Sequence, residues 1–455
     1  MHFDTVIHNC TIITANHKFD IVKHGIICIK NGRLEKISTK AHEQKLPDSK
    51  KVIDAKNGIV MPGLINTHTH LPMTLFRGLA DDLPLDTWLN EHIFPAEKKH
   101  INSESIRYGT LLACCEMLLS GTTTCCDGYF LEDTVAEAVS ESGMRAILGQ
   151  GVIDFPAPGV ADPSNNIKNA VEFAKKWLGV SPNIIPSIFC HSPYTCSTRT
   201  LKQAKTAATN QGLLFQIHVS ETKQELYQMQ SEHRMTPVEY LDSIGILDAN
   251  TLCAHCVWLD GDDIEIIAKQ NAKISHNPES NMKLAAGVAP VPRCLNSGIT
   301  VGLGTDGCAS NNNLDLFQEM DMAAKLHKVV SHDPTAMEAK SVITMATLAG
   351  ARAIGLDNEI GSLEVGKQAD LIIIDTDKPH LKPMYNPVSH IVYAALGSDV
   401  QDVLVAGNIL VRNRKLQTLD LDSTLKKVNK ISRLISSKNY VPENRTPIFT
   451  DSHRF

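Results

Sequence analysis

Between residues 61 and 360, short apolar runs alternate with segments of helical periodicity, and this alternation constrains the fold more than any other feature of the chain. Eight apolar runs read as strands: 59–65, 122–127, 145–152, 184–190, 213–219, 251–254, 272–275 and 300–304. Helix-like segments lie between them, among them 103–119, 166–178, 200–211 and 260–270. Eight strand–helix units within about 300 residues predict the α/β fold class and a (β/α)8 TIM-like barrel.

Segments rich in predicted strands stand on both sides of the barrel. Residues 1–60 alternate apolar and polar side chains, and Asn31-Gly32 is a strong signal for a tight hairpin. Further strands are expected after residue 360, including a pair around the turn 406–408. We therefore expect residues 1–60 and 361–420 to form one small discontinuous β-sandwich domain, with the catalytic barrel of residues 61–360 inserted in it. A C-terminal helix at 421–436 and a poorly ordered tail should occupy 421–455.

Composition and charge exclude several classes of function. With 43% hydrophobic and 21% charged side chains, the 455 residues are typical of a globular protein. The net charge of −6 comes without a Lys- or Arg-rich block, which disfavours a nucleic-acid partner. No apolar run reaches membrane-spanning length, and the first residues do not resemble a signal peptide. We expect a cytoplasmic enzyme that binds neither nucleic acid nor membrane, with its twelve cysteines reduced and structural.

The carboxyl ends of the predicted strands are rich in histidine, and active sites of α/β barrels form at these ends. The first strand leads into His68 and His70, and residues two apart on a strand point to the same face. Taken alone, such a pair is as easily a chance or surface feature. Five further strands, however, end in a histidine or an aspartate: His191, His218, His255, His276 and Asp306. Random scatter of 19 histidines does not readily produce this series.

These residue types indicate a metal-dependent hydrolase. His68, His70 and His218 offer neutral nitrogen ligands and Asp306 an anionic oxygen, a set that suits one divalent cation. A bound cation would lower the pKa of its water and create a hydroxide nucleophile. Glu221, three residues after His218, could carry protons between that water and a substrate. His255 could hydrogen-bond the attacking hydroxide or stabilise charge on the substrate, although a histidine there by itself would more simply be a core residue. The ligand set favours zinc, but iron, manganese or nickel would also fit.

The pattern of His68-x-His70 with His218, His255 and Asp306 resembles the metal-dependent amidohydrolase superfamily. The fourth strand lacks the terminal lysine that bridges the metals of two-metal members, which points to a mononuclear site. Four longer motifs look like the methylthioadenosine/S-adenosylhomocysteine deaminase branch, which also holds triazine chlorohydrolases: PGLINTHTH at 62–70, HSPY at 191–194, HNPESNMKL at 276–284 and GTDG at 304–307.

The resemblance implies hydrolytic deamination of the adenine ring of 5′-modified adenosines, such as 5′-methylthioadenosine, S-adenosylhomocysteine or adenosine, to an inosine-type product and ammonia. It implies that Glu221 protonates a ring nitrogen and that Asp306 takes a proton from the attacking water. Glu97 matches a glutamate that can bind ribose hydroxyls, and His191 matches a substrate-contacting histidine. Trp88 could form part of the pocket wall, or it could equally be a residue that only packs in the core. Glu97 could equally be an ordinary surface carboxylate.

One departure from the family bears on the substrate. Some members place arginines after the third strand to bind the homocysteine carboxylate. Here residues 149–156 carry none, and the next arginine is Arg199. Methylthioadenosine or adenosine is therefore the safer expectation.

Other activities fit the same residues. Guanine deamination and triazine amino- or chlorohydrolysis would use the same site, and a non-catalytic relative could keep the barrel as a scaffold. Such a scaffold would not need the complete ligand set with its proton shuttle. The expected partner is a small-molecule nucleoside, and the sequence leaves open whether the protein is a homo-oligomer.

Overall fold

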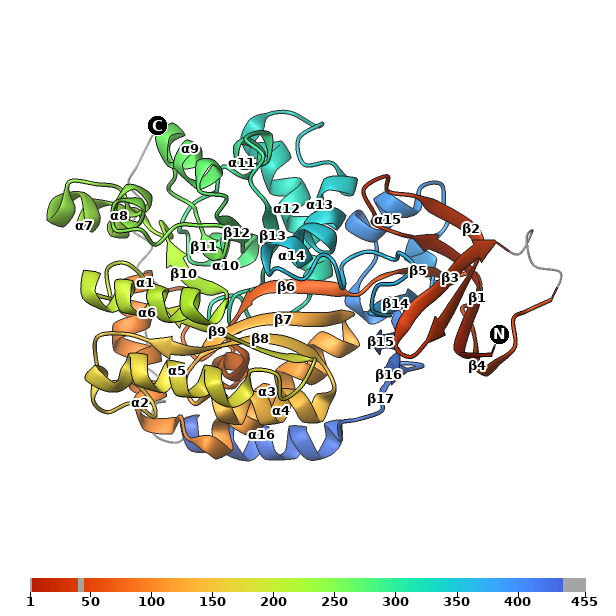
Figure 1. Ribbon diagram of the computed structural model, residues 1–455, viewed down its shortest axis with the longest axis horizontal. Helices are drawn as coiled ribbons and strands as arrows, with labels where there is room; N and C mark the ends of the chain where they lie inside the picture. Colours follow the sequence, from red (N-terminus) through yellow and green to blue (C-terminus); the bar gives the residue numbers. More distant parts are fainter. Residues whose placement is uncertain (1, 40–44, 437–455) are drawn as a thin grey trace, which may run out of the picture.

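An eight-stranded parallel barrel forms the centre of the computed structural model, which describes residues 2–39 and 45–436 (Figure 1). Its strands follow one another in chain order around the sheet: β6 (Leu64–Thr69), β7 (Thr122–Tyr129), β8 (Arg145–Val152), β9 (Ile184–Cys190), β10 (Phe215–Val219), β11 (Thr251–His255), β12 (Lys273–His276) and β13 (Val301–Leu303). The first and last strands meet where the Asp306 amide donates to the His68 carbonyl at 2.9 Å. The predicted barrel is confirmed.

Helices surround the barrel, and polar side chains mark where many of them begin. Asn102, Ser197 and Thr222 accept hydrogen bonds from free amides at the starts of α3 (Ser103–Leu119), α6 (Thr198–Gln211) and α7 (Lys223–His233). The helices that follow the strands are α3 (Ser103–Leu119), α4 (Glu132–Ser142), α5 (Asn166–Trp177), α6 (Thr198–Gln211), α7 (Lys223–His233), α8 (Pro237–Ser243), α9 (Gly261–Lys269), α10 (Pro278–Lys283), α11 (Val291–Asn296), α12 (Leu316–Ser331), α13 (Ala339–Met345) and α14 (Leu348–Ala353).

The predicted first strand, 59–65, is two strands in the structure, so the prediction of a single strand was wrong. β5 (Ile59–Pro62) pairs with strands of a second sheet, and β6 begins at Leu64. Gly63 lies between them, where an added Cβ would meet the Thr123 side chain at 2.1 Å. The run is apolar throughout because every residue of β5 and of β6 is buried, although the two strands belong to different sheets.

The second sheet is mixed and joins the two ends of the chain. It contains β1 (Phe3–Ile13), β2 (Ile21–Lys30), β3 (Arg33–Thr39), β4 (Ser49–Asp54), β5, β14 (Leu371–Ile374), β15 (Val400–Val405), β16 (Asn408–Arg412) and β17 (Lys415–Leu416). β5 and β14 pair antiparallel, which links the N-terminal and C-terminal strands. Asn31 and Gly32, with φ of 50° and 76°, form the predicted hairpin turn between β2 and β3. The domain boundaries at 60, 360 and 420 stay predictions.

Buried contacts hold the mixed sheet against the barrel. The guanidinium of Arg145, at the start of β8, donates to both carboxylate oxygens of Asp370 at 3.0 and 3.2 Å, just before β14. Helix α15 (Pro387–Tyr393) packs on α12 and α13, and α16 (Leu421–Ser436) packs along α3. The predicted poorly ordered tail lies outside the described residues from 437 onward. Within the part of the chain that is described, no helix is both long and apolar enough to cross a membrane.

A long connection between β6 and α3 covers the carboxyl ends of the barrel strands. It consists of η2 (Leu71–Phe76), α1 (Leu85–Thr87), the π-helical turn η3 (Trp88–Ile93) and α2 (Phe94–His100). In Figure 1, α1, α2 and α7 lie at one end of the molecule and the mixed sheet at the other. The strand ends that carry the predicted site residues therefore face away from the mixed sheet.

Candidate active site

His68, His70 and Asp306 meet at the seam of the barrel. The His70 Nε2 and His68 Nε2 atoms lie 3.2 and 3.4 Å from the same carboxylate oxygen, Oδ1 of Asp306. The other His70 nitrogen, Nδ1, is 2.6 Å from the Gly128 carbonyl oxygen and must carry its proton there, because a carbonyl only accepts. The Nε2 atom of His70 therefore faces the carboxylate either with a second proton or with a lone pair directed at a cation between them.

His218 and His255 complete the cluster from β10 and β11. The His218 Nε2 atom lies 3.2 Å from the His68 Nε2 atom. Two groups could hold a metal ion, His68 with His218 and His255, and His68 with His70 and Asp306. In each group the ligand atoms lie within 4.8 Å of one another, and the groups share His68. Convergent imidazole nitrogens beside one carboxylate fit a divalent cation.

Burial shapes the protonation of this cluster. It lowers the pKa of His68 to about 4 and that of His218 well below the ordinary value, so both imidazoles are neutral at pH 7 and able to bind a cation. Burial opposes ionisation of Asp306 as well, but hydrogen bonds with His68 and His70 keep the pKa of that carboxyl well below its usual range. His68 and His218 therefore offer neutral nitrogens and Asp306 an anionic oxygen at neutral pH. Although burial opposes it, the Asp306 carboxylate raises the pKa of His70 to about 9, so His70 holds a proton that a bound cation would replace.

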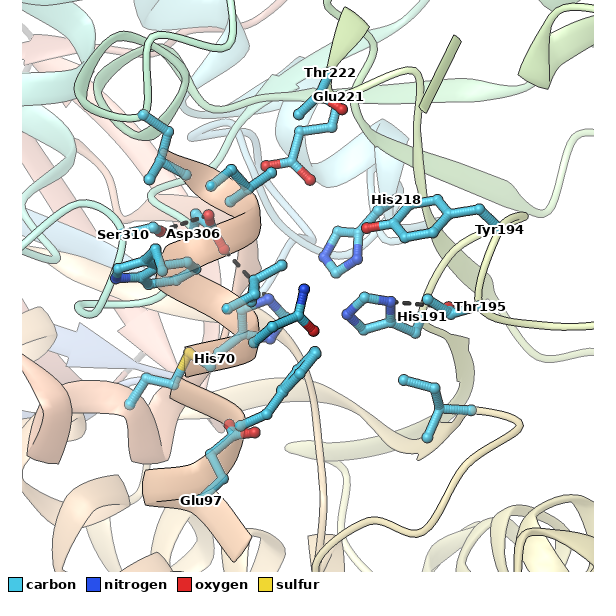
Figure 2. Close-up of a pocket in the computed structure, with 18 of the residues that line it drawn as sticks. His70, Glu97, His191, Tyr194, Thr195, His218, Glu221, Thr222, Asp306 and Ser310 are labelled. Atoms are coloured by element: carbon cyan, nitrogen blue, oxygen red, sulfur yellow. Dashed lines mark hydrogen bonds and ion pairs between the residues drawn. The ribbon is translucent and has the colours of Figure 1, made fainter. Parts of the chain in front are cut away.

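Two serines that the sequence reasoning missed orient Asp306. The hydroxyls of Ser280 and Ser310 donate to its Oδ2 atom at 2.7 and 2.6 Å, which leaves Oδ1 facing the histidines. Figure 2 shows Ser310 on one side of Asp306 and His70 on the other. Asp306 itself has a left-handed backbone, with φ of 60°. Ser280 lies within the 276–284 motif, but no residue pattern pointed to Ser310, which reaches Asp306 through the turn after β13.

Glu221 and His255 face each other across the cluster. The His255 Nε2 atom is 3.9 Å from the Glu221 carboxylate, and the His255 Nδ1 atom donates to the Asn281 side-chain oxygen at 2.9 Å. Burial raises the pKa of Glu221. Glu225, another residue that sequence reasoning missed, accepts bonds from the Ser220 and Glu221 amides at 2.9 and 2.7 Å and so holds the turn that aims Glu221.

The residues predicted to bind substrate border one cavity of about 1910 Å³: Trp88, Glu97, His191 and Glu221. Glu97, only 3% exposed, accepts a hydrogen bond from the Tyr129 hydroxyl, and burial raises its pKa to about 7. The His191 Nδ1 atom lies 3.0 Å from the Thr195 hydroxyl, and Trp88 is buried in the cavity wall. Except for His68, every predicted site residue lines this cavity: His70, Trp88, Glu97, His191, His218, Glu221, His255 and Asp306.

Comparison with known proteins identifies the family. The model of the amidohydrolase family matches residues 59–410, most of the chain. The chain belongs to the amidohydrolase family.

Within the amidohydrolase family, the chain is similar to several deaminases. A 5-methylthioadenosine/S-adenosylhomocysteine deaminase of Syntrophobacter fumaroxidans is 44% identical over 95% of this chain and 98% of its own length. A 5′-deoxyadenosine deaminase of Methanothermobacter thermautotrophicus is 47% identical over 88% of this chain and 92% of its own. Among solved structures, a zinc-bound adenosine deaminase from Xanthomonas campestris is 33% identical, has a TM-score of 0.93, and matches 96% of this chain and 99% of its own.

One histidine of the strand-end series lies outside the cluster of this amidohydrolase. The His276 Nε2 atom, at the end of β12, is 3.1 Å from the His327 Nε2 atom on α12. Both rings are buried, and burial lowers the pKa of His327 to about 4. A neutral pair of this kind joins β12 to the helix that covers it, so His276 takes a packing position.

Proposed function

We propose that this amidohydrolase deaminates the adenine ring of 5′-modified adenosines. Water replaces the exocyclic amine, giving an inosine-type product and ammonia. The observation that carries the proposal is the pairing of a His/Asp cluster with Glu221 and His255 in one cavity that also holds the buried carboxyl of Glu97. Relatives at 44–47% identity are named as deaminases of 5′-modified adenosines.

His68, His70, His218 and Asp306 would hold one divalent cation, with zinc the best candidate. The support comes from the Nε2 atoms of His68 and His70, which both lie close to Oδ1 of Asp306, and from zinc in the adenosine deaminase of similar structure. Bound there, the cation would supply a water of lowered pKa next to Glu221 and His255.

Glu221, His255 and Asp306 would move the protons. Burial raises the pKa of Glu221, which favours its protonated form more than in an exposed glutamate and suits it to deliver a proton to the ring nitrogen adjoining the reacting carbon. Asp306 accepts a proton from the attacking water through Oδ1, because Ser280 and Ser310 occupy Oδ2. Asn281 holds the His255 Nδ1 proton, so His255 Nε2 presents a lone pair or a proton to the reacting group.

Glu97, His191 and Trp88 would bind the substrate. Glu97 is a hydrogen-bond acceptor for ribose hydroxyls, held in place by Tyr129. His191, between Thr195 and the cluster, is placed to contact the purine, and Trp88 walls the cavity. A bare guanine or a triazine would have no hydroxyl for Glu97, which is why the nucleoside is preferred over these ring substrates.

The experiment is ammonia release from a panel by the zinc-loaded protein, with the products identified by mass spectrometry. The panel contains 5′-methylthioadenosine, 5′-deoxyadenosine, adenosine, guanine and a chlorotriazine. We expect the adenosines to be deaminated and the free rings to be poor substrates. Turnover of guanine or the triazine alone would replace the proposal with one of those activities. No turnover on any of them, by protein that also does not retain a stoichiometric metal ion, would favour the scaffold alternative.

A further inference from the structure

The cavity wall beside Glu97 is aromatic. Phe94 lies one helical turn before Glu97 on α2, so the two side chains share a face of that helix. The Phe94 ring centroid is 5.7 Å from that of Phe155 and 6.4 Å from that of His191. In Figure 2, Glu97 and Glu221 lie on opposite sides of the group formed by His70, His191 and His218. The aromatic wall therefore continues from the end of the cavity that is remote from Glu221.

Phe155 belongs to a loop that is held firmly. Its neighbour Asp154 turns away from the cavity and accepts hydrogen bonds from the Ser197 amide and the Thr200 hydroxyl at 2.6 and 2.7 Å. Further along, the backbones of Ala157 and Val160 exchange hydrogen bonds of 3.0 and 2.9 Å. These contacts fix Phe155, with Pro156, Ala157 and Pro158 after it, as a cavity wall. Residues 153–161 contain neither lysine nor arginine.

We propose that Phe94 and Phe155 form the subsite for the 5′ substituent of the nucleoside and select an uncharged one. This inference rests on the proposed function, because the pose follows from the reacting end. With the amine-bearing carbon at the cluster and the adjoining ring nitrogen at Glu221, the opposite edge of the purine, which carries the ribose, points toward Glu97. The 5′ group, one atom beyond the ribose, then meets the apolar wall.

The aromatic wall should discriminate between substrates by the charge of their 5′ substituent. A methylthio or methyl group gains contact area with two aromatic rings there. A carboxylate in the same place would lose hydration without gaining a cation, which is strongly unfavourable. The subsite therefore favours methylthio- and deoxyadenosine over substrates with an anionic 5′ extension.

Three lysines also line the cavity and represent the rival interpretation. Lys283 is bound to Asp81 and Asn312, both at 2.6 Å. The Lys223 ammonium lies over the Tyr227 and Trp258 rings, 5.5 and 5.4 Å from their centroids. Lys98, exposed on α2 after Glu97, is the cation nearest in sequence to the aromatic wall. If Lys98 reached the 5′ group, an anionic substituent would be favoured instead.

The test compares two nucleosides of the same shape that differ in charge. They are 5′-(3-carboxypropyl)thioadenosine and its carbamoyl counterpart, in which a neutral amide replaces the carboxylate. We expect wild-type protein to deaminate the amide with a kcat/KM at least about tenfold higher than the acid, and 5′-methylthioadenosine better still. Equal values for acid and amide, or a preference for the acid, would overturn the inference.

Matched variants locate the effect. Phe155→Arg should move the acid-to-amide ratio toward the acid by about tenfold or more, whereas Phe155→Leu, which stays apolar, should leave that ratio unchanged. A preference for the acid in wild-type protein that disappears in Lys98→Ala would assign recognition to the lysine and overturn the inference. Zinc content and circular dichroism check that each variant is folded.

The two proposals fail in different ways. Turnover of both analogues at equal rates leaves the deaminase function standing and removes only the selective wall. Absence of an inosine-type product from 5′-methylthioadenosine, adenosine and both analogues would overturn the proposed function, and this inference with it.

Discussion

The two ends of the cavity are built by different means. The reacting end consists of side chains at the carboxyl ends of barrel strands, each held by hydrogen bonds to its neighbours. Three residues there, Ser220, His255 and Asp306, adopt left-handed backbone conformations with φ of 52°, 72° and 60°. Non-glycine residues in this region are strained, and such strain persists only where surrounding contacts fix it. Serines, Asn281 and Glu225 supply those contacts.

The substrate end, by contrast, is built from connections between barrel elements. Trp88, Phe94 and Glu97 come from the segment between β6 and α3, and Phe155 comes from the loop after β8. The Phe94 ring contacts the rings of Phe155 and His191, and the hydrogen bond from Tyr129 to Glu97 adds a polar contact. The difference suggests that the rigid strand ends set the reaction type while the connections set which molecule is bound.

The largest expected effect is at the reacting end. Glu221→Gln removes the carboxyl that moves protons but keeps the size of the side chain. We expect kcat to fall by at least about 100-fold, the usual contribution of a positioned acid or base. Steady-state kinetics with 5′-methylthioadenosine measure the loss, and metal analysis should show that the cation is retained. A near-normal rate would remove Glu221 from its proposed role.

Glu97 provides a test of the substrate end through stability. Burial raises its pKa to about 7, so the protonated form is favoured in the folded protein. Its contribution to stability is therefore complete below the unfolded pKa, which is about 4.3, and is lost as the pH rises through about 7. We expect this change to be up to about 3 kcal/mol of unfolding free energy.

Glu97→Gln should be free of that loss, because the amide does not ionise. Denaturant unfolding of wild type and variant at pH 5 and pH 8 measures the difference. As the pH rises, the free energy of unfolding of the wild type should fall relative to that of the variant. A difference in unfolding free energy that does not depend on pH would show that the pKa of Glu97 is not raised in the folded protein.

Asn281 tests whether the reacting end depends on its supporting hydrogen bonds. Asn281→Ala removes the acceptor for the His255 Nδ1 proton. We expect a fall in kcat of roughly tenfold, the lower limit for loss of such a supporting partner. Asn281→Asp keeps an oxygen at that position and should recover most of the rate. Equal losses in both variants would mean that Asn281 acts through packing alone.

The smallest effect is expected at Trp88. Trp88→Phe trims part of the cavity wall and should raise the KM for 5′-methylthioadenosine roughly threefold with little change in kcat, because it removes uniform binding. A lowered melting temperature with an unchanged KM would instead identify Trp88 as a packing residue.

Much of the fold was predictable because periodicity reports burial directly. The bounds of β8, β9, α3 and α16 agree with the apolar and helical runs at 145–152, 184–190, 103–119 and 421–436. The run at 59–65 was wrongly predicted to be one strand, since hydrophobicity alone does not reveal which sheet buries a residue. The membership of the amidohydrolase family is confirmed, while the roles of the individual site residues stay predictions.

The sequence by itself determined the barrel, the strand-end histidines with Asp306, and the family, because each depends on local pattern or on motifs that are continuous in the chain. Only the tertiary structure decided that Ser310 and Asn281 orient Asp306 and His255, that His276 pairs with His327, and that Phe94 meets Phe155. Those contacts join residues from different strand–helix connections, and no local pattern encodes which side chains meet when the barrel brings its loops together.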